Sequence, residues 1–231
     1  MKILSFENLL DGVFIERRNR FLGIVQMGNR YVEVAVRDSG RLEELLFKGN
    51  KVKIIPSKKS GRKTEYDLLS AYSDAGFVLV NSSLHRDIFQ RILDEGLLFS
   101  GDKVISKPEV KVRGSRLDFF VEVGDRKIWI ETKGCTLARN RIALFPDAPT
   151  LRGKRHVEEL IELKREGYES MIVFLVFRSD AEVFLPNFET DPEFSHAFIS
   201  AIKEGIKVFC PVFGFKGDSL YYLRNIPMVR I

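Results

Sequence analysis

The chain has 231 residues, of which 45% are hydrophobic, and a formal net charge of +5. Its longest apolar run, "MIVFLVF" at residues 171–177, has the length of a strand, so we expect no membrane span and no membrane contact. The first residues carry acids early and lack an apolar stretch before a small-residue cleavage site, which excludes an ordinary signal peptide. These features predict a cytoplasmic protein in which Cys135 and Cys210 are buried, reduced thiols.

The positive charge is concentrated in the first third of the chain. Residues 1–80 hold 14 lysines and arginines against 10 acidic residues, whereas residues 81–231 hold 23 against 22. Because basic side chains that neutralise phosphates release counterions, this excess favours contact with a polyanion. A bias of this size is common among soluble proteins, so the charge alone does not identify a nucleic acid as the partner.

The first eighty residues show the pattern of short strands separated by turns. Gly28-Asn29 is a two-residue hairpin signal, a later strand closes at Pro56, and two further strands are separated at residues 74–76. Residues 39–49 hold one short helix or a turn. Five short strands and one small helix predict a small β-barrel of the oligonucleotide-binding (OB) type in residues 1–80, with a β-sandwich as the alternative.

The stretch "ERRNRF" places three arginines beside Phe21 in this barrel. On an OB-like barrel, such a mixture favours a groove that binds phosphates and stacked bases. The alternative is a solvated strand edge, where charges protect against aggregation. Arg17, Arg18 and Arg20 are therefore candidate nucleic-acid-binding residues.

After residue 80 the pattern changes to alternating helices and strands. The spacing of apolar residues and the cap-type residues predict three helices, at residues 81–96, 149–167 and 191–205. Thr150 and Asp191 are the expected caps of the last two, and residues 171–177 read as a strand buried on both faces. The chain therefore divides into an OB-like barrel (1–80) and a mixed sheet flanked by helices (81–231). Its fold class is two-domain α/β, α+β overall.

The stretch "IWIETKG" at residues 128–134 places Glu131 and Lys133 on an apolar strand. Because side chains alternate along a strand, these two residues share a face. Upstream, "SRLDFFVEVGDRK" offers a turn at Gly124-Asp125. A two-residue loop there places Asp118 opposite Glu131, and a four-residue loop places it opposite Lys133. In either register the three charged side chains lie on one face.

Two carboxylates that face each other across paired strands repel, unless a cation lies between them. Mg²⁺ or Mn²⁺ would take oxygen ligands from Asp118 and Glu131, and Lys133 would orient or activate a water molecule and offset charge in the transition state. This arrangement predicts metal-assisted hydrolysis of phosphodiesters, with all three residues catalytic. The alternative is a salt-bridged ladder that only stabilises the sheet.

The third candidate group lies on the expected helix 149–167. Arg152 and His156 are one helical turn apart and could contact a scissile phosphate. Equally, Arg152 could pair with a carboxylate and His156 could be a half-buried polar residue. Asp147, which follows a proline, fits a turn or a helix cap better than a ligand.

The sequence resembles the sugar fermentation stimulation protein (SfsA) family over nearly its whole length. The resemblance rests on "ERRNRFLGIV", "SGRLEELL", "TEYDLL", "SRLDFFVEV", "ETKGCTL" and, most specifically, "FPDAPTLRGKRHVEELIEL". It implies an OB barrel followed by a domain of the PD-(D/E)XK nuclease type, DNA binding, and a link to sugar catabolism. By motif, Asp118 matches the lone acid of such nucleases, and Glu131 and Lys133 match their E-x-K pair.

The chain departs from the family pattern at two places. His85-Arg86 stands where we expect Pro-Asn, and Asp38 replaces an expected Asn. Nucleases of this type often add an acid from the first helix, where Asp87, Asp94 and Glu95 are available.

Two functions therefore compete at this point. The first is a DNA-binding protein of low sequence specificity with a Mg²⁺- or Mn²⁺-dependent nuclease centre. The second is a non-catalytic DNA-binding regulator of sugar-catabolic genes on a nuclease-like scaffold. The sequence does not decide between single- and double-stranded DNA, and leaves open whether two chains form a homodimer.

Overall fold

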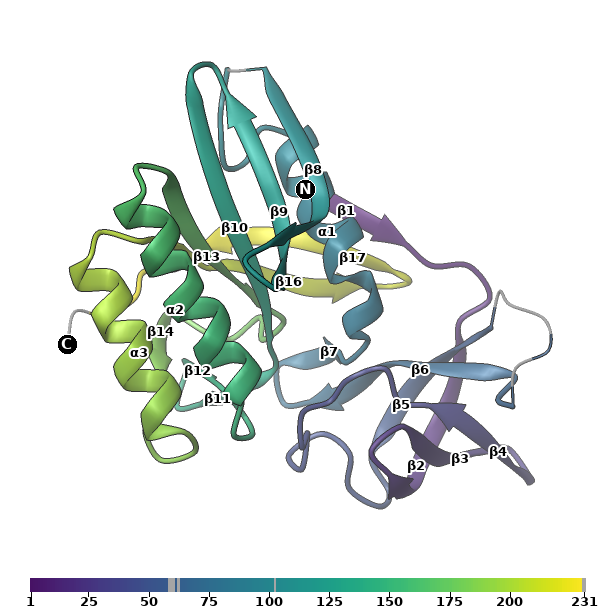
Figure 1. Ribbon diagram of the computed structural model, residues 1–231. Coiled ribbons are helices and arrows are strands. Elements are labelled where there is room, and N and C mark those ends of the chain that lie inside the picture. The colour runs from purple at the N-terminus through teal and green to yellow at the C-terminus, as the bar shows by residue number, and fades with distance from the viewer. Residues whose placement is uncertain (58–60, 62, 102, 230–231) are drawn as a thin grey trace.

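The computed structural model describes residues 1–57, 61, 63–101 and 103–229, which form a small barrel beside a larger three-layered domain (Figure 1). The barrel sheet has the strand order β4-β3-β2-β5-β6-β7, and a parallel pairing of β4 with β6 closes five of these strands into a barrel. The strand bounds are β2 Leu10–Asn19, β3 Leu22–Met27, β4 Arg30–Ala35, β5 Lys51–Pro56, β6 Tyr66–Ser73 and β7 Gly76–Leu79.

The barrel expected from the sequence is therefore present. Gly28 and Asn29 form the two-residue turn between β3 and β4, and Pro56 ends β5. The segment at residues 41–48 is a series of turns and not a helix. Leu42 has a positive φ of 53°, which a helix does not allow, and the N–H groups of Leu45 and Leu46 both donate to Leu42 O in a local turn.

The larger sheet has the order β1-β17-β16-β13-β10-β9-β8, with β15 also paired to β13. Its strands are β1 Lys2–Ser5, β8 Val104–Val112, β9 Ser115–Val123, β10 Arg126–Cys135, β13 Glu169–Val176, β15 Lys207–Phe209, β16 Pro211–Lys216 and β17 Ser219–Asn225. The strand β13 pairs in parallel with β10, β15 and β16, and the other pairings are antiparallel, so the sheet is mixed as expected.

The strand β1 departs from the expected division at residue 80. It precedes the barrel in the chain, yet it pairs antiparallel with β17 at the edge of the larger sheet. The barrel is therefore inserted between β1 and the rest of the larger domain. The four residues of β1 have mixed polarity, and nothing in this short sequence indicates that they pair with β17.

Helices cover both faces of the larger sheet (Figure 1). A 3₁₀ turn, η1 (Ser82–Leu84), leads into α1 (His85–Asp94), and α2 (Leu151–Arg165) and α3 (Pro192–Lys203) lie together on the other face. The predicted caps are confirmed, since the Thr150 side chain accepts from Gly153 N and the Asp191 side chain accepts from Phe194 N. Covered on both sides, β13 is buried almost throughout.

A third, smaller sheet was not expected from the sequence. It joins β11 (Leu137–Arg139), β12 (Ile142–Phe145) and β14 (Val183–Pro186) in that order. Each of these strands has three or four residues, which is too short to show the alternation of apolar and polar side chains that indicates a strand. The hairpin of β11 and β12 turns at Asn140 and Arg141, which both have positive φ.

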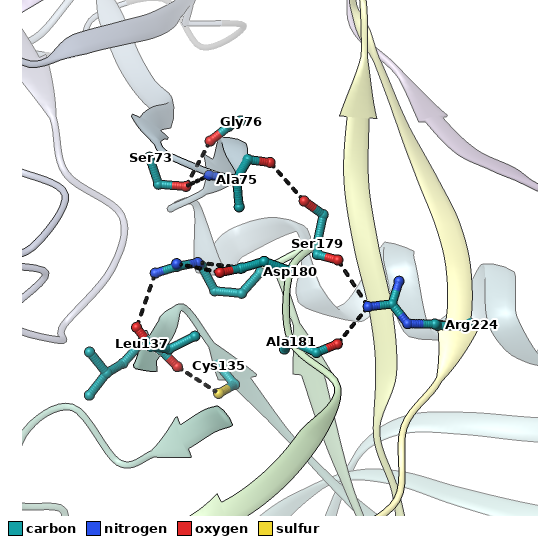
Figure 2. Close-up of polar contacts among 11 residues, drawn as sticks. Ser73, Ala75, Gly76, Cys135, Leu137, Ser179, Asp180, Ala181 and Arg224 are labelled. Carbon is teal, nitrogen blue, oxygen red and sulfur yellow. Dashed lines mark hydrogen bonds and ion pairs between the residues drawn. The ribbon is translucent and has the colours of Figure 1, made fainter. Parts of the chain in front are cut away.

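The barrel and the larger domain are joined by core packing and by polar contacts. One apolar cluster contains Phe14 and Val25 of the barrel together with Phe89 of α1 and Ile130 of β10. In Figure 2, the Ser179 hydroxyl donates to Ala75 O in the β6–β7 turn at 2.7 Å. Both cysteines are free and buried, as predicted. In the described part of the chain, no helix is long and apolar enough to cross a membrane.

Candidate functional site

The hairpin of β9 and β10 brings the three predicted catalytic residues together. Arg126 pairs with Val123 and Ile130 with Phe119, which is the register of a two-residue loop. One step beyond the last paired residues, Asp118 lies beside Glu131, and the Asp118 N–H donates to Glu131 Oε2 at 3.3 Å. Together with Lys133, these carboxylates line one hollow of about 480 Å³.

Glu131 lies on the floor of this hollow and is only 3% exposed. Its Oε1 accepts a hydrogen bond from Lys133 Nζ at 2.5 Å and is in hydrogen-bond contact with His156 Nδ1. Burial alone would raise the pKa of Glu131, but the charge of Lys133 and the contact with His156 outweigh it. The pKa therefore lies below its ordinary value, and the carboxylate stays ionised.

Asp118 is held differently, although it is a close neighbour. Its Oδ2 accepts from Thr132 N at 2.8 Å and from Thr132 Oγ1 at 2.6 Å. Burial first, and then the charge of Glu131, raise the pKa of Asp118. The opposite shifts follow from the geometry, in which Lys133 and His156 contact Glu131, whereas Asp118 is buried beside the charge of Glu131.

His156 is buried behind the Glu131 carboxylate and is not exposed at the surface of the hollow. It is 2% exposed, and its Nε2 accepts from Arg152 Nε at 3.4 Å. With Nε2 as the acceptor, Nδ1 is the nitrogen that carries a hydrogen and donates to Glu131 Oε1. The buried-residue interpretation of His156 fits this geometry, because both ring nitrogens already have partners, Glu131 and Arg152.

A second histidine forms part of the site and was not predicted. His85, at the start of α1, stacks on Phe177 with ring centroids 5.3 Å apart. A Cβ atom on Gly134 would lie 2.3 Å from His85 Cε1, so the ring fits only against glycine. Burial, and then the charge of Lys133, lower the pKa of His85 to about 4, so the ring is neutral at physiological pH.

The site continues toward the barrel and along α2. A second hollow of about 480 Å³ is lined by Arg20 and Asp38 of the barrel and by Lys133 and Asp147 of the larger domain. A third, of about 620 Å³, lies between the β8–β9 hairpin and α2. Arg152 lines all three hollows and marks the point where they meet.

The three predicted arginines of the barrel have different surroundings. Arg18 is exposed and pairs with Glu16 and Glu33, whereas Arg20 lines the hollow that contains Lys133. The Arg17 guanidinium is already occupied, because it donates to four backbone carbonyls, those of Arg20, Asp38, Gly40 and Arg41. Only Arg20 therefore combines exposure with a place at the site.

Arg17→Ala is expected to destabilise the protein by about 1.5–3 kcal/mol, because its charge-assisted hydrogen bonds hold the 38–41 loop. Arg18→Ala, at the next position of β2 and exposed to solvent, is the matched control and should cost less than about 1 kcal/mol. Urea denaturation followed by circular dichroism measures both. Equal losses for the two variants would show that Arg17 does not organise the loop.

The acids expected to complete a metal shell do not reach the site. On α1, Asp87 pairs with Arg86, Asp94 accepts from Gln90, and Glu95 pairs with Arg91. Asp147 lies in a bend before α2, as one of its two expected roles has it, and its Oδ2 accepts from Leu42 N of the barrel at 3.3 Å, whereas Thr150 is the cap. Sequence reasoning missed Glu109, which lines the hollow of the carboxylates.

The donor set fits one hard cation with a largely hydrated shell. Asp118 Oδ1 has no hydrogen-bond partner among the described residues, and Glu131 Oε2 has only the long contact with Asp118 N. Across residues 1–57, 61, 63–101 and 103–229, no group of three or more His, Cys, Asp and Glu side chains stands in metal-binding geometry. Water or substrate oxygens would therefore fill the remaining positions, as Mg²⁺ commonly prefers.

The fold and the site define a two-domain protein that joins an OB barrel to a mixed α/β domain with a buried carboxylate–lysine cluster. Comparison with known proteins agrees with this class. Residues 15–80 match the family model "SfsA N-terminal OB domain", and residues 83–218 match "Sugar fermentation stimulation protein RE domain". The chain belongs to the sugar fermentation stimulation protein (SfsA) family.

Relatives cover almost the full length of the chain. A sugar fermentation stimulation protein homolog of Thermosipho melanesiensis is 41% identical over 229 residues, which is 99% of this chain and 98% of that protein. A homolog of Saccharolobus solfataricus is 41% identical over 97% of this chain and 87% of that protein. The solved structure of Pyrococcus furiosus SfsA in complex with Ca²⁺ covers all of both chains, with a TM-score of 0.93 and 30% identity.

Proposed function

We propose that the protein binds DNA with little sequence preference and hydrolyses phosphodiester bonds with one divalent cation held by Asp118 and Glu131. One observation carries the proposal: two carboxylates lie side by side in a hollow, and the salt bridge from Lys133 goes to Glu131, whereas Asp118 is held by Thr132. A purely structural ladder would not need the second carboxylate, and its burial is costly without a counter-ion.

In the proposed hydrolysis, each residue of the site would have a separate role. Hydrolysis forms a phosphorus–oxygen bond to the water oxygen and breaks the bond to the leaving alkoxide. The water gives up a proton and the alkoxide takes one up. Lys133 would orient the attacking water and stabilise the negative charge that develops on the phosphate, while Glu131 fixes the position of the lysine. His156, held by Arg152, keeps Glu131 oriented. A bound Mg²⁺ or Mn²⁺ would supply Lewis acidity and a water of lowered pKa.

A calcium complex of a related protein supports the choice of ligand class. The Pyrococcus furiosus SfsA structure was solved with Ca²⁺, and Ca²⁺, Mg²⁺ and Mn²⁺ all favour oxygen ligands. Asp118 and Glu131 are the oxygen donors that this chain presents in its hollow.

The DNA backbone would be held by cations around the site. Five basic residues line the third hollow, namely Lys111, Arg113, Arg116, Arg152 and Arg155. Arg113 pairs with Glu166 and Arg116 with Glu109, whereas Lys111 and Arg155 make no ion pair with the residues described. The charges of Lys111 and Arg155 are therefore free to neutralise phosphates.

The double variant Lys111→Ala/Arg155→Ala is expected to weaken DNA binding without altering cooperative unfolding. Removal of each phosphate-binding cation should make the slope of log affinity against log salt shallower by about 0.7–0.9, so the double variant should lose about 1.4–1.8. Fluorescence anisotropy with labelled DNA over a range of salt concentrations measures the slope. Lys203→Ala on α3, an exposed lysine away from the hollows, is the matched control. An unchanged slope in the double variant would remove this surface from the DNA interface.

One observation favours the second function, a DNA-binding regulator of sugar-catabolic genes without catalysis. Glu131 Oε1 is already occupied by Lys133 and His156, so half of the carboxylate pair is balanced without a metal. The family name points to a role in sugar fermentation for relatives of this chain.

The deciding experiment is incubation of the full chain with labelled single- and double-stranded DNA in Mg²⁺, Mn²⁺ or EDTA. Cutting that requires the metal supports the phosphodiesterase. Binding without cutting under all metal conditions would overturn it and favour the regulator.

A further inference from the structure

We propose that the preferred ligand of the site is an unpaired nucleic-acid strand, with a base stacked on Phe21 while the backbone descends toward Lys133. This inference rests on the proposed function in that it assumes a nucleic-acid ligand. It adds the class of substrate and assigns a binding role to Phe21.

The depth of the site is the first reason. Glu131 is 3% exposed and the Lys133 side chain 14% exposed, so a reacting phosphate must enter the hollow to reach them. Each of the two hollows that share Lys133 has a volume of about 480 Å³, which is the scale of a pocket for a small molecule. A duplex is stiff over about 150 base pairs and carries its phosphates on a wide cylinder, whereas an unpaired strand can bend into such a space.

The contact between the two walls is the second reason. The hollow near the barrel is lined on one side by Arg20 and Asp38 and on the other by Asp147. These walls touch, because Asp147 Oδ2 accepts from Leu42 N, and a Cβ atom on Gly40 would lie 2.3 Å from the same oxygen. Widening the hollow for a duplex would break this contact, but a single strand needs no widening.

The third reason is an exposed aromatic ring on the barrel, next to Arg20, which lines the hollow. Phe21 is 60% exposed, and the guanidinium of the neighbouring Arg20 lies 5.6 Å from its ring centroid. Arg20 itself lines the hollow that contains Lys133. A ring for stacking beside a cation for the phosphate is the combination that holds unpaired bases. In a duplex the faces of the bases are already stacked and are not available to the ring.

The test compares the binding of one short labelled oligonucleotide, single-stranded or annealed to its complement, by fluorescence anisotropy in EDTA. The wild-type chain should bind the single strand more tightly. Phe21→Ala should weaken single-strand binding roughly tenfold and leave duplex binding unchanged, and Phe21→Trp should retain the affinity. Phe47→Ala, which removes another exposed barrel phenylalanine that lines a separate hollow beside Arg139 and not the one beside Arg20, should change neither.

Tighter binding of the duplex, or equal losses for both DNAs in Phe21→Ala, would overturn the proposal. The proposed catalysis fails separately. Selective single-strand binding without metal-dependent cutting would refute the phosphodiesterase and support this inference. Metal-dependent cutting of duplexes without any preference for single strands would support the phosphodiesterase and refute this inference.

Discussion

Lys133→Met should reduce metal-dependent cleavage of DNA by about a hundred- to a thousandfold while DNA binding persists. Lys133 is the cation nearest to the carboxylate pair, and its Nζ is fixed by Glu131 Oε1. Methionine keeps most of the apolar stem of the side chain and removes the charge that would stabilise the attacked phosphate. Single-turnover cleavage of end-labelled DNA in Mg²⁺ or Mn²⁺ measures the effect.

The matched control for Lys133 is Lys127→Met, on the same strand β10 but exposed and paired opposite Glu122. It should retain wild-type cleavage. A thermal melt should accompany both variants, because removal of Lys133 takes the ammonium group away from the buried Glu131, which keeps hydrogen bonds from His156 and Asp118 N. Undiminished cutting by a well-folded Lys133→Met protein would exclude this lysine from the chemistry.

Asp118→Asn should separate stability from metal binding. The asparagine amide keeps an oxygen that can accept from Thr132 N and Thr132 Oγ1, and it removes the repulsion with Glu131. The metal-free protein should therefore be more stable by up to about 1 kcal/mol. The same change removes a charged ligand, so both cleavage and stabilisation by metal should disappear.

Melting curves with increasing Mg²⁺, Mn²⁺ or Ca²⁺ test this expectation. A cation present at about a hundred times its dissociation constant stabilises a folded protein by about 2.7 kcal/mol, and only the wild type should show such a gain. Glu122→Gln, which changes another partly buried acid on β9, is the control and should keep the metal response. If Asp118→Asn kept the full response, Asp118 would not be a ligand.

The centre of the site could be predicted because it depends on short-range rules. The alternation of β9 and β10 and the turn at Gly124-Asp125 are enough to place Asp118, Glu131 and Lys133 on one face, and the two-residue loop of the structure then selects Glu131 as the neighbour of Asp118. The caps of α2 and α3 follow in the same way, from Thr150 and Asp191. Each of these predictions needed only residues that are close in the chain.

The parts that could not be predicted depend on distant contacts. A row of arginines does not reveal that the Arg17 guanidinium faces four carbonyls, three of them in the 38–41 loop. Nor does a histidine that begins a helix reveal the glycine it packs against, Gly134 on β10. In both cases the partner is brought close only by the tertiary fold.

The pairing of β1 with β17 has a consequence for folding during synthesis on the ribosome. The barrel, residues 10–79, is synthesised early and can fold while the rest is still being made. The strand β1 must wait, because β17 follows all other strands of the larger sheet in the chain. A fragment that begins after the barrel would lack β1 and leave the edge of β17 open to intermolecular pairing. Expression of residues 81–231 alone is therefore a route to aggregates, whereas a permuted chain with β1 placed after β17 should restore the covered edge.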